Sequence, residues 1–309
     1  MPLSLTFHTV TDTDLVSFCA GTDGAVDLEA RLTRYLESGM VRPEWCWLAF
    51  DSAGMIAARH YWWSRPGSDS PFGVDHVSAE VHGAAVELLV HARDELAVNE
   101  AYCEVTAPIE LGDDPSQVRA DLVSVLGDSG FDFEVARVTV EWTTGSVTPS
   151  EADRLTFRSA RSLDERQLVG LFQSVGDRSL DHAMVADRAR VGADQEARER
   201  LANVRSYPSH PDWFVVAFDG RDELVGYVLP AFAGDVPIIA EIGVAAAHRG
   251  HGYVSELLSW ATRCLVASGA TRIVADTDRA NTPMRAAFTR GGYREFRLRD
   301  DYLWERLEK

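Results

Sequence analysis

One order of elements occurs twice along this chain, and it limits the possible folds more than any other feature. In the second half, WFVVAF (213–218), the turn DGRDE and LVGYVLPAF (224–232) are typical of a β-hairpin, and the strand VPIIAEIGV (236–244) follows. In the first half, WCWLAF (45–50), DSAG and MIAARHYWW (55–63) repeat that hairpin. Apolar runs joined by short Gly- and Asp-containing turns indicate paired strands. The repetition therefore predicts two copies of one fold in tandem.

Each half then continues with a helix, a strand and a second helix. In the first half, a helix is expected over 84–96 and the strand AYCEVTAP over 101–108. In the second half, an amphipathic helix is expected over 250–268, the strand TRIVADT over 271–277 and a short helix over 281–290. The expected helices are distinguished from the strands by apolar residues that recur at helical spacing. The chain thus alternates strands and helices in both halves.

A polar segment separates the two halves. TTGSVTPSEADR (143–154) is rich in Thr, Ser, Gly and Pro, which is typical of a linker. It predicts one domain over 1–145 and a second over 154–309. Shortly after it, Ser162 and Glu165 are spaced as a capping box and are expected to open a helix.

Composition narrows the class of partner. The 309 residues carry a formal net charge of −18, and 46% of them are hydrophobic, which is enough for large cores. An acidic surface repels phosphate backbones, so nucleic acid is not an expected partner. It favours cationic small molecules, although acidity alone is common among soluble proteins. The oligomeric state is not predicted.

The sequence carries no signature of a membrane or of an oxidising compartment. The start, MPLSLTFHTVTDTD, lacks a basic region followed by an apolar one, and no run approaches the ~18 apolar residues of a membrane span. The four cysteines, Cys19, Cys46, Cys103 and Cys264, are far apart, which argues against a disulfide framework or a zinc knuckle. A cytoplasmic protein is expected. No metal site is expected either, because no His/Cys cluster or HExxH motif occurs.

Two glycines stand where the helix over 250–268 should begin. The strand ending at Val244 is followed by Arg249-Gly250-His251-Gly252, and glycine weakens a first helical turn. The N–H groups of a helix N-terminus attract anions, and glycine lets the backbone come close to a bulky one. The pattern predicts a cradle for a pyrophosphate. The alternative is a turn that needs glycine for its own geometry.

Motifs further along the chain resemble those of the GNAT family of N-acetyltransferases. That family's acyl-CoA motif is [RQ]-x-x-G-x-[GA], which Arg249 and Gly252 match, whereas Val254 departs from it. A later block, N-x-x-[AM]…G-[FY], is matched by Asn281, Met284 and Gly292-Tyr293. The likeness covers 155–306. It implies an α/β (α+β) fold of two tandem domains, each a mixed, mostly antiparallel twisted sheet flanked by helices.

The resemblance also implies where acetyl-CoA would bind. The strand residues Ile242, Gly243 and Val244 would lie along the pantetheine arm, with the Val244 N–H facing the thioester oxygen. The backbone from Arg249 through Gly250, His251, Gly252 and Tyr253 to Val254 would hold the pyrophosphate. Asn281 would contact the pantetheine or a water, and Phe288 would lie at the cofactor.

Glu241 is the candidate catalytic base. It precedes Ile242 on the strand that enters the site, where a partly desolvated carboxylate can take a proton from the attacking amine. An ordinary strand carboxylate is the alternative. Asp276 and Asp278 are candidate contacts for a cationic acceptor, although turn and capping roles suit Asp better. Many family members carry a Tyr acid where Phe288 stands, so the acid is missing unless Tyr302 or His251 replaces it.

The first copy lacks the glycine-bearing loop, because VHGAAVEL (81–88) follows its third strand. It is expected to act as a scaffold or to shape the acceptor site. Its cluster of Trp45, Trp47, Tyr61, Trp62 and Trp63 is interpreted as core packing rather than a ligand wall. His182 and His210 are interpreted as exposed loop residues rather than acceptor contacts.

Together these features predict an acetyl-CoA-dependent N-acetyltransferase acting on a small amine, with an active second copy. The alternative is a non-catalytic protein that binds acyl-CoA or sequesters a ligand.

Overall fold

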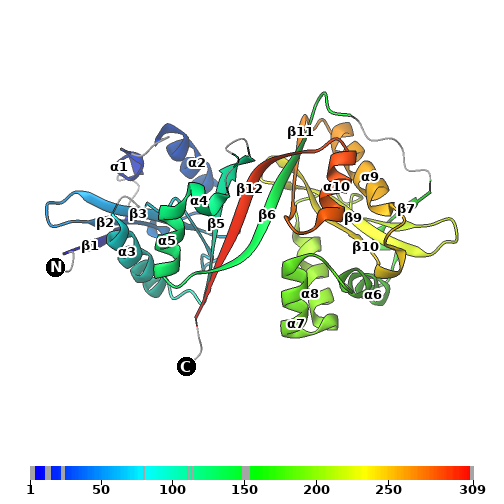
Figure 1. Ribbon diagram of the computed structural model, residues 1–309, viewed down its shortest axis with the longest axis horizontal. Coiled ribbons are helices and arrows are strands. Elements are labelled where there is room, and N and C mark those ends of the chain that lie inside the picture. Colours follow the sequence, from blue (N-terminus) through cyan, green and yellow to red (C-terminus); the bar gives the residue numbers. More distant parts are fainter. Residues whose placement is uncertain are drawn as a thin grey trace. The chain divides into compact units, whose positions relative to one another are not determined.

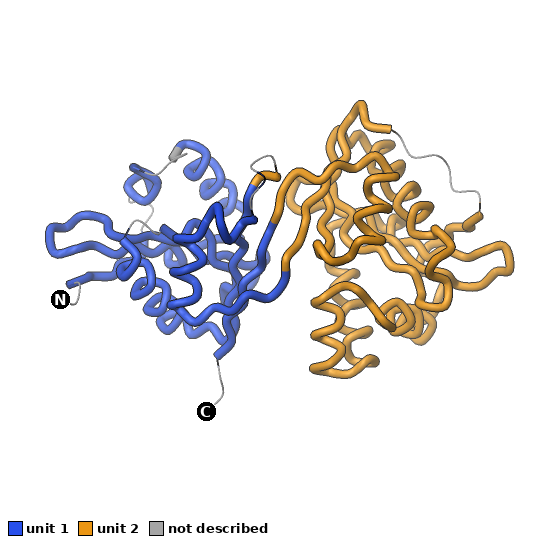
Figure 2. The backbone as a smooth tube through the Cα atoms, viewed as in Figure 1, with its two compact units in different colours: residues 1–107, 111–135, 299–309 blue, residues 108–110, 136–298 orange. Residues whose placement is uncertain are grey.

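The structure is a computed structural model of the chain, and it divides into two compact units (Figure 2). It describes residues 4–10, 15–21, 25–78, 81–109, 112, 114–147 and 154–306. Unit 1 comprises residues 1–107, 111–135 and 299–309, and unit 2 comprises residues 108–110 and 136–298. Much of the predicted linker, residues 148–153, lies outside the described residues.

Unit 1 has a mostly antiparallel sheet with helices on its faces (Figure 1). Its strands follow the order β1-β2-β3-β4-β5 and then β12, and β4 and β5 run parallel. Its elements are β1 (Thr6–Thr9), α1 (Leu15–Cys19), α2 (Ala25–Ser38), η1 (Pro43–Trp45), β2 (Cys46–Phe50), β3 (Ile56–Trp63), β4 (Gly73–Asp75), α3 (His82–Glu95), β5 (Glu100–Pro108), α4 (Pro115–Val118) and α5 (Ala120–Asp128).

Unit 2 repeats this plan. Its sheet has the order β6-β11-β10-β9-β8-β7, and its parallel pair is β10 and β11. Its elements, with the two strands shared between the units, are β6 (Asp132–Thr143), β7 (Thr156–Ser159), η3 (Ala160–Ser162), α6 (Glu165–Gly176), α7 (His182–Val191), α8 (Ala193–Ser206), β8 (Val215–Phe218), β9 (Leu224–Ala233), β10 (Val236–Val244), η4 (Ala246–His248), α9 (Tyr253–Ala267), β11 (Arg272–Asp278), α10 (Thr282–Arg290) and β12 (Arg294–Glu305). The predicted fold class and the tandem arrangement are confirmed.

The units differ from the ranges 1–145 and 154–309 because two strands pass from one to the other. The strand β6 starts in unit 1, and its residues Arg137 to Thr143 pair antiparallel with β11 of unit 2. The strand β12 starts in unit 2 and ends in unit 1, which contains residues from Arg299 onward. The ladder hydrogen bonds place these strand ends with the sheet they join, whatever their position in the sequence.

Each sheet is covered on both faces by a separate hydrophobic core. In unit 2, one core joins the sheet to α9 and α10, and the other joins it to α6, α7 and α8. In unit 1, Trp45, Trp47 and Trp62 lie in one core, and Tyr61 lies in the other with Trp63 against it. The prediction that these aromatic side chains pack in the cores is confirmed.

The expected elements are present, with differences at their ends. The cap of α6 is formed by Asp164 and Gln167, whose side chains and backbone N–H groups bond reciprocally, rather than by Ser162 and Glu165. Ser162 instead donates its hydroxyl to the Ser159 carbonyl. The four cysteines are free thiols. Within the described residues, no helix combines the length and apolarity that crossing a bilayer requires.

Candidate functional site

The strand β10 separates from β11 partway along its length. The two strands are in parallel register at Ile238 and Val274, near the start of β10. A β-bulge follows, where the register of β10 with β9 shifts between Ile239 and Glu241. A bulge bends the strand that carries it. After the bulge, Glu241 to Val244 stay paired with β9. Their other edge lies beyond the position at which β10 pairs with β11.

The bulge also decides which side chains face which core. Ile238 and Ala240 pack in the core beneath α6 and α8, whereas Ile239 packs in the core beneath α9. After the extra residue, Glu241 faces the α8 side, and Ile242 and Val244 pack against the α9 core. The bulge thus brings the predicted base to the α8 side and leaves Ile242 and Val244 facing α9.

Gly243 on β10 and Gly226 on β9 occupy neighbouring positions of the ladder, in which Gly243 pairs with Tyr227 and Gly226 pairs with Val244. An added side chain would collide at both positions. A Cβ added to Gly243 would come within 2.5 Å of the Val175 Cγ1 atom. A Cβ added to Gly226 would come within 2.2 Å of the Gly243 carbonyl oxygen. Close packing of the strands and α6, rather than backbone conformation, explains these glycines.

The loop between β10 and α9 has two left-handed residues, both glycine. The φ angles are +83° at Gly250 and +77° at Gly252, values that strain other residues. Gly252 is the N-cap of α9 and offers no side chain to satisfy the first N–H groups of the helix. A Cβ at Gly250 would find no described atom within 4 Å. The loop geometry therefore needs glycine, and it also leaves the helix N-terminus open to an anion.

Arg154 is a cation at this loop that the motifs did not indicate. Its Nη1 donates to the His251 carbonyl at 2.9 Å, and its guanidinium lies 5.2 Å from the centre of the Tyr253 ring. It also forms an ion pair with Glu256, in the first turn of α9. Arg154 is the last residue of the predicted linker and carries no sequence signal, because only folding brings it to the loop.

The side chain of Arg249 points away from the helix N-terminus. Its guanidinium donates to the carbonyls of Val175 at 2.5 Å, Asp177 at 2.7 Å and Arg178 at 2.9 Å, and its Nε donates to Val244 at 3.2 Å. A cation at the C-terminus of α6 satisfies carbonyls there and complements the helix dipole. Arg249 thus fastens the loop to α6, and only its backbone stays a candidate for the pyrophosphate.

Glu241 is largely buried between a cation and a phenol. Its Oε2 lies 3.3 Å from the Arg200 Nη2 and accepts a hydrogen bond of 3.4 Å from the Tyr227 hydroxyl. Burial raises the pKa of Glu241 above the usual range of a glutamate, and the Arg200 guanidinium opposes that shift. Arg200 also pairs with Glu196, one turn earlier on α8. Burial thus makes the Glu241 carboxylate a better proton acceptor than an exposed glutamate.

Two aspartates lie at the N-terminus of α7, on the same side of the sheet as Glu241. Asp181 caps α7 by accepting from the Met184 N–H at 2.8 Å. Asp278, at the end of β11, accepts from the His182 N–H at 2.6 Å and pairs with Arg137 at 3.3 Å. The charge of Asp181 raises the pKa of both Glu241 and Asp278, after burial as the larger cause. Asp181 therefore interacts electrostatically with both of the other carboxyl groups.

The aspartates of β11 have structural partners, as the capping interpretation suggested, although Asp278 caps α7 rather than the next helix. Asp276 accepts a hydrogen bond of 2.6 Å from the Thr139 hydroxyl. The histidines of this region, His182 and His210, are exposed as expected, but His182 is the first residue of α7 rather than a loop residue.

The remaining predicted residues are divided between surface and core. Asn281 is the N-cap of α10, and its side chain accepts from the Met284 N–H at 3.3 Å. Phe288 is 2% exposed and packs against the Tyr293 ring in the α9 core. His251 is exposed at the loop. Tyr302 is buried in the core of unit 1, against Phe133.

One family model matches part of unit 2. Residues 182–293 match the model of the acetyltransferase (GNAT) family. No curated protein sequence matches the chain significantly.

Solved structures resemble the fold of the whole chain at low sequence identity. A GNAT acetyltransferase from Sphaerobacter thermophilus aligns with a TM-score of 0.62 and 14% identity, over 99% of this chain and 96% of that one. A tandem GNAT protein from the clavulanic acid biosynthesis pathway aligns with a TM-score of 0.52 and 14% identity, over 99% of this chain and all of that one. The glucosamine N-acetyltransferase region of a fungal multidomain β-N-acetylglucosaminidase aligns with a TM-score of 0.56 and 14% identity, over 98% of this chain and 38% of that one.

Proposed function

We propose, from the premise that residues 182–293 form a domain of the acetyltransferase (GNAT) family, that this chain moves an acetyl group from acetyl-CoA to the amine of a small cationic acceptor. Unit 2 is the proposed site of the reaction. One observation carries the proposal: β10 leaves β11 at a bulge that orients Glu241, and then runs into an open, glycine-bearing helix N-terminus.

The donor is proposed to lie along the free side of β10. Strand backbone that has lost its neighbour can hydrogen-bond an extended amide chain such as pantetheine, as an added strand would. Ile242, Gly243 and Val244 are the residues for this contact, with the Val244 N–H aimed at the thioester oxygen. The N–H groups from Arg249 to Val254 would hold the diphosphate, with the helix dipole and the nearby Arg154 guanidinium adding positive charge.

Glu241 is proposed to remove the proton of the acceptor ammonium. The free amine then attacks the thioester carbonyl, so that a C–N bond forms and the C–S bond breaks. A base is most effective when its pKa lies close to the working pH, and burial moves the pKa of Glu241 in that direction. Arg200 and Tyr227 would orient the carboxylate and stabilise its negative charge by the hydrogen bonds that they donate to it.

The acceptor is proposed to be cationic because of the carboxyl groups near the base. Asp181 acts electrostatically on both Glu241 and Asp278, and the chain as a whole has a net charge of −18. An ammonium group near them would gain favourable interactions before it loses its proton. The exposed helix α7, which starts beside Asp181, would contribute to the acceptor side.

Unit 1 is proposed to be a scaffold rather than a second donor site. Its helix α3 corresponds in order to α9, but it follows Val81, which has an ordinary extended backbone, instead of a glycine loop. His82, at the start of α3, lies 2.7 Å from the Asp128 carboxylate. A carboxylate near a helix N-terminus competes with a phosphate for it.

One observation favours a second function, which is binding of acyl-CoA without turnover. Phe288, which stands where many family members carry an acidic Tyr, is buried and has no proton to give to the leaving thiolate. A protein that binds acyl-CoA without turnover would keep the glycine loop before α9 and would not need the general acid.

Release of free thiol from acetyl-CoA, measured over a panel of mono- and polyamines, separates the two functions. The transferase proposal expects release that depends on the amine and fails if acetyl-CoA binds by calorimetry but no amine causes release. In the active case, Glu241→Gln should lower turnover by about 100-fold or more while the Kd for acetyl-CoA changes little. The rate of the parent protein should rise with pH through the pKa of Glu241, and the variant should lose this rise.

A matched variant separates proton transfer from the charge on Arg200. Glu196 contacts the same guanidinium from within α8. Glu196→Gln should therefore keep most of the turnover and its pH dependence. Equal losses in the two variants would assign the effect to Arg200 and remove Glu241 from the mechanism.

A further inference from the structure

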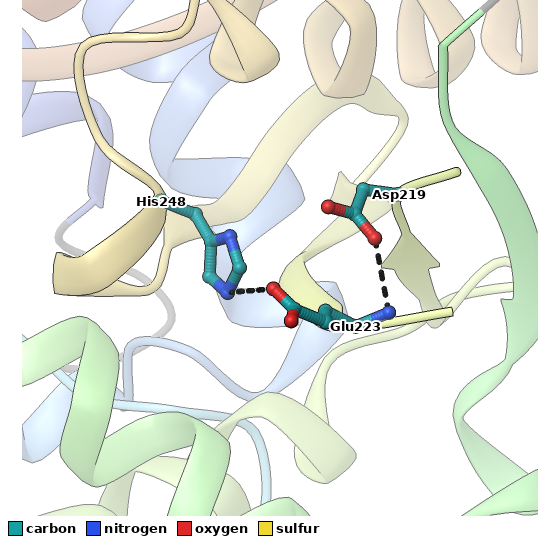
Figure 3. A group of neighbouring side chains, drawn as sticks. All are labelled: Asp219, Glu223 and His248. Atoms are coloured by element: carbon teal, nitrogen blue, oxygen red, sulfur yellow. Dashed lines mark hydrogen bonds and ion pairs between the residues drawn. The ribbon is translucent and has the colours of Figure 1, made fainter. Parts of the chain in front are cut away.

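Three possible metal ligands meet at a second place in unit 2 (Figure 3). Asp219 and Glu223 lie in the turn between β8 and β9, and His248 lies in the short helix η4. One oxygen from each carboxylate and one ring nitrogen of His248 all lie within 4.8 Å of one another. No sequence motif indicated this group, because 24 residues lie between Glu223 and His248.

Hydrogen bonds within the turn fix the orientation of the Asp219 carboxylate. Its Oδ1 accepts the N–H groups of Arg221 at 2.9 Å and Glu223 at 3.0 Å, and the two strand ends are joined by a backbone bond from Asp219 to Glu223. These two bonds fix the carboxylate through one oxygen, and its other oxygen takes no part in them.

The spacing of His248 and Glu223 is too long for a direct hydrogen bond. The His248 Nε2 and Glu223 Oε2 atoms are 4.0 Å apart. Two ligands of one tetrahedral zinc, each ~2.1 Å from the metal, are about 3.4 Å apart. Glu223 is exposed and His248 is half-buried, so small rotations of the Glu223 side chain would close the remaining distance.

We propose that Asp219, Glu223 and His248 form a binding site for a divalent transition-metal ion of the zinc type. Two carboxylates and a neutral imidazole match the charge and the mixed O/N ligands of such ions, whereas Mg²⁺ prefers oxygen ligands and gives up its water reluctantly. The ion would join the β8–β9 turn to η4, which directly precedes Arg249 and the glycine loop. The site is separate from the proposed acetyl-transfer chemistry and does not depend on it.

Calorimetric titration of the EDTA-treated, dialysed full chain with ZnCl₂, without acetyl-CoA, tests this site. One ion should bind per chain, MgCl₂ should give no binding heat under the same conditions, and the Tm should rise with zinc. His248→Gln, Glu223→Gln and Asp219→Asn should each weaken zinc binding at least tenfold. Asn can still accept the N–H groups of the turn through its Oδ1, so Asp219→Asn should fold normally.

The pair of His210 and Asp212 provides a matched control. The His210 Nδ1 and Asp212 Oδ2 atoms are also 4.0 Å apart, but both side chains are exposed, and among the described residues no third His, Cys, Asp or Glu joins them in a ligand group. His210→Gln should leave zinc binding unchanged. The site is refuted if the parent chain binds no zinc, if the three ligand variants bind it as the parent does, or if His210→Gln loses it equally.

Discussion

Substitution of Gly226 by alanine tests the packing on which the donor side of unit 2 depends. The added Cβ would lie 2.2 Å from the Gly243 carbonyl oxygen and 3.2 Å from the Val244 Cα. Ordinary van der Waals contact needs at least 3.4 Å, so β10 has to move by about 1 Å at Gly243 and Val244. Both neighbours are backbone atoms, and no side-chain rotation relieves the contact.

The expected cost follows from that displacement. Overpacking of this kind lowers the free energy of unfolding by about 1–3 kcal/mol. A displacement of ~1 Å at groups that position a reactant can lower kcat/KM by about 100-fold. Urea unfolding measures the first effect, and acetyl-CoA-dependent thiol release measures the second. Gly226→Ala should therefore lose activity well beyond its loss of folded protein.

A second glycine in the same unit provides the opposite expectation. Gly170 lies on the exposed side of α6, and a Cβ there meets no described atom within 4 Å. Gly170→Ala should stabilise the chain by ~1 kcal/mol, because alanine favours a helix. If Gly226→Ala unfolds and turns over as the parent does, the close approach of β9 and β10 is wrong. If it does not fold, Gly243→Ala repeats the test, because its added Cβ meets side-chain atoms of Val175 and Tyr227 rather than backbone atoms.

Two further predictions concern the glycine loop and the core of unit 1. Gly252→Glu should abolish acetyl-CoA binding in calorimetry, because it places bulk and negative charge at the N-terminus of α9, whereas Gly234→Glu, at another left-handed glycine in the β9–β10 turn, should bind as the parent does. His60 is fully buried, and burial lowers its pKa from 6.5 to about 3. Below pH 6.5 the unfolded chain takes up a proton that the folded chain does not, so stability should fall by about 1.4 kcal/mol per pH unit as the pH drops toward 3. His60→Gln should flatten this slope in urea unfolding, and an unchanged slope would exclude His60 as its cause.

The sequence predicted the elements of unit 2 well because their patterns are local. The strand over 236–244 has the bounds observed for β10, and the amphipathic helix past Val244 differs from α9 mainly at its start, which the two left-handed glycines delay to Tyr253. The cap of α6 was misplaced because Ser162 and Asp164 are both good N-cap residues, and the surrounding backbone selects between them.

The environment of the site was less predictable, because it depends on contacts between distant segments. The position of Glu241 on the strand was readable, but its partner Arg200 comes from a polar helix without a motif. The motif identified Arg249, yet the direction of its side chain is decided by the carbonyls at the end of α6. The exchange of β6 and β12 has no local pattern at all, since a strand's partners are chosen by the whole sheet.

That exchange means that neither unit is a single continuous piece of the polypeptide. A truncation after residue 145 would leave the N-terminal unit without the residues from Arg299 onward, and a fragment starting at Arg154 would lack the segment that pairs with β11. Cutting the backbone between Ser146 and Leu155 should therefore leave the two pieces bound to each other. The two halves should co-purify after such a cut and should fail to fold when expressed singly.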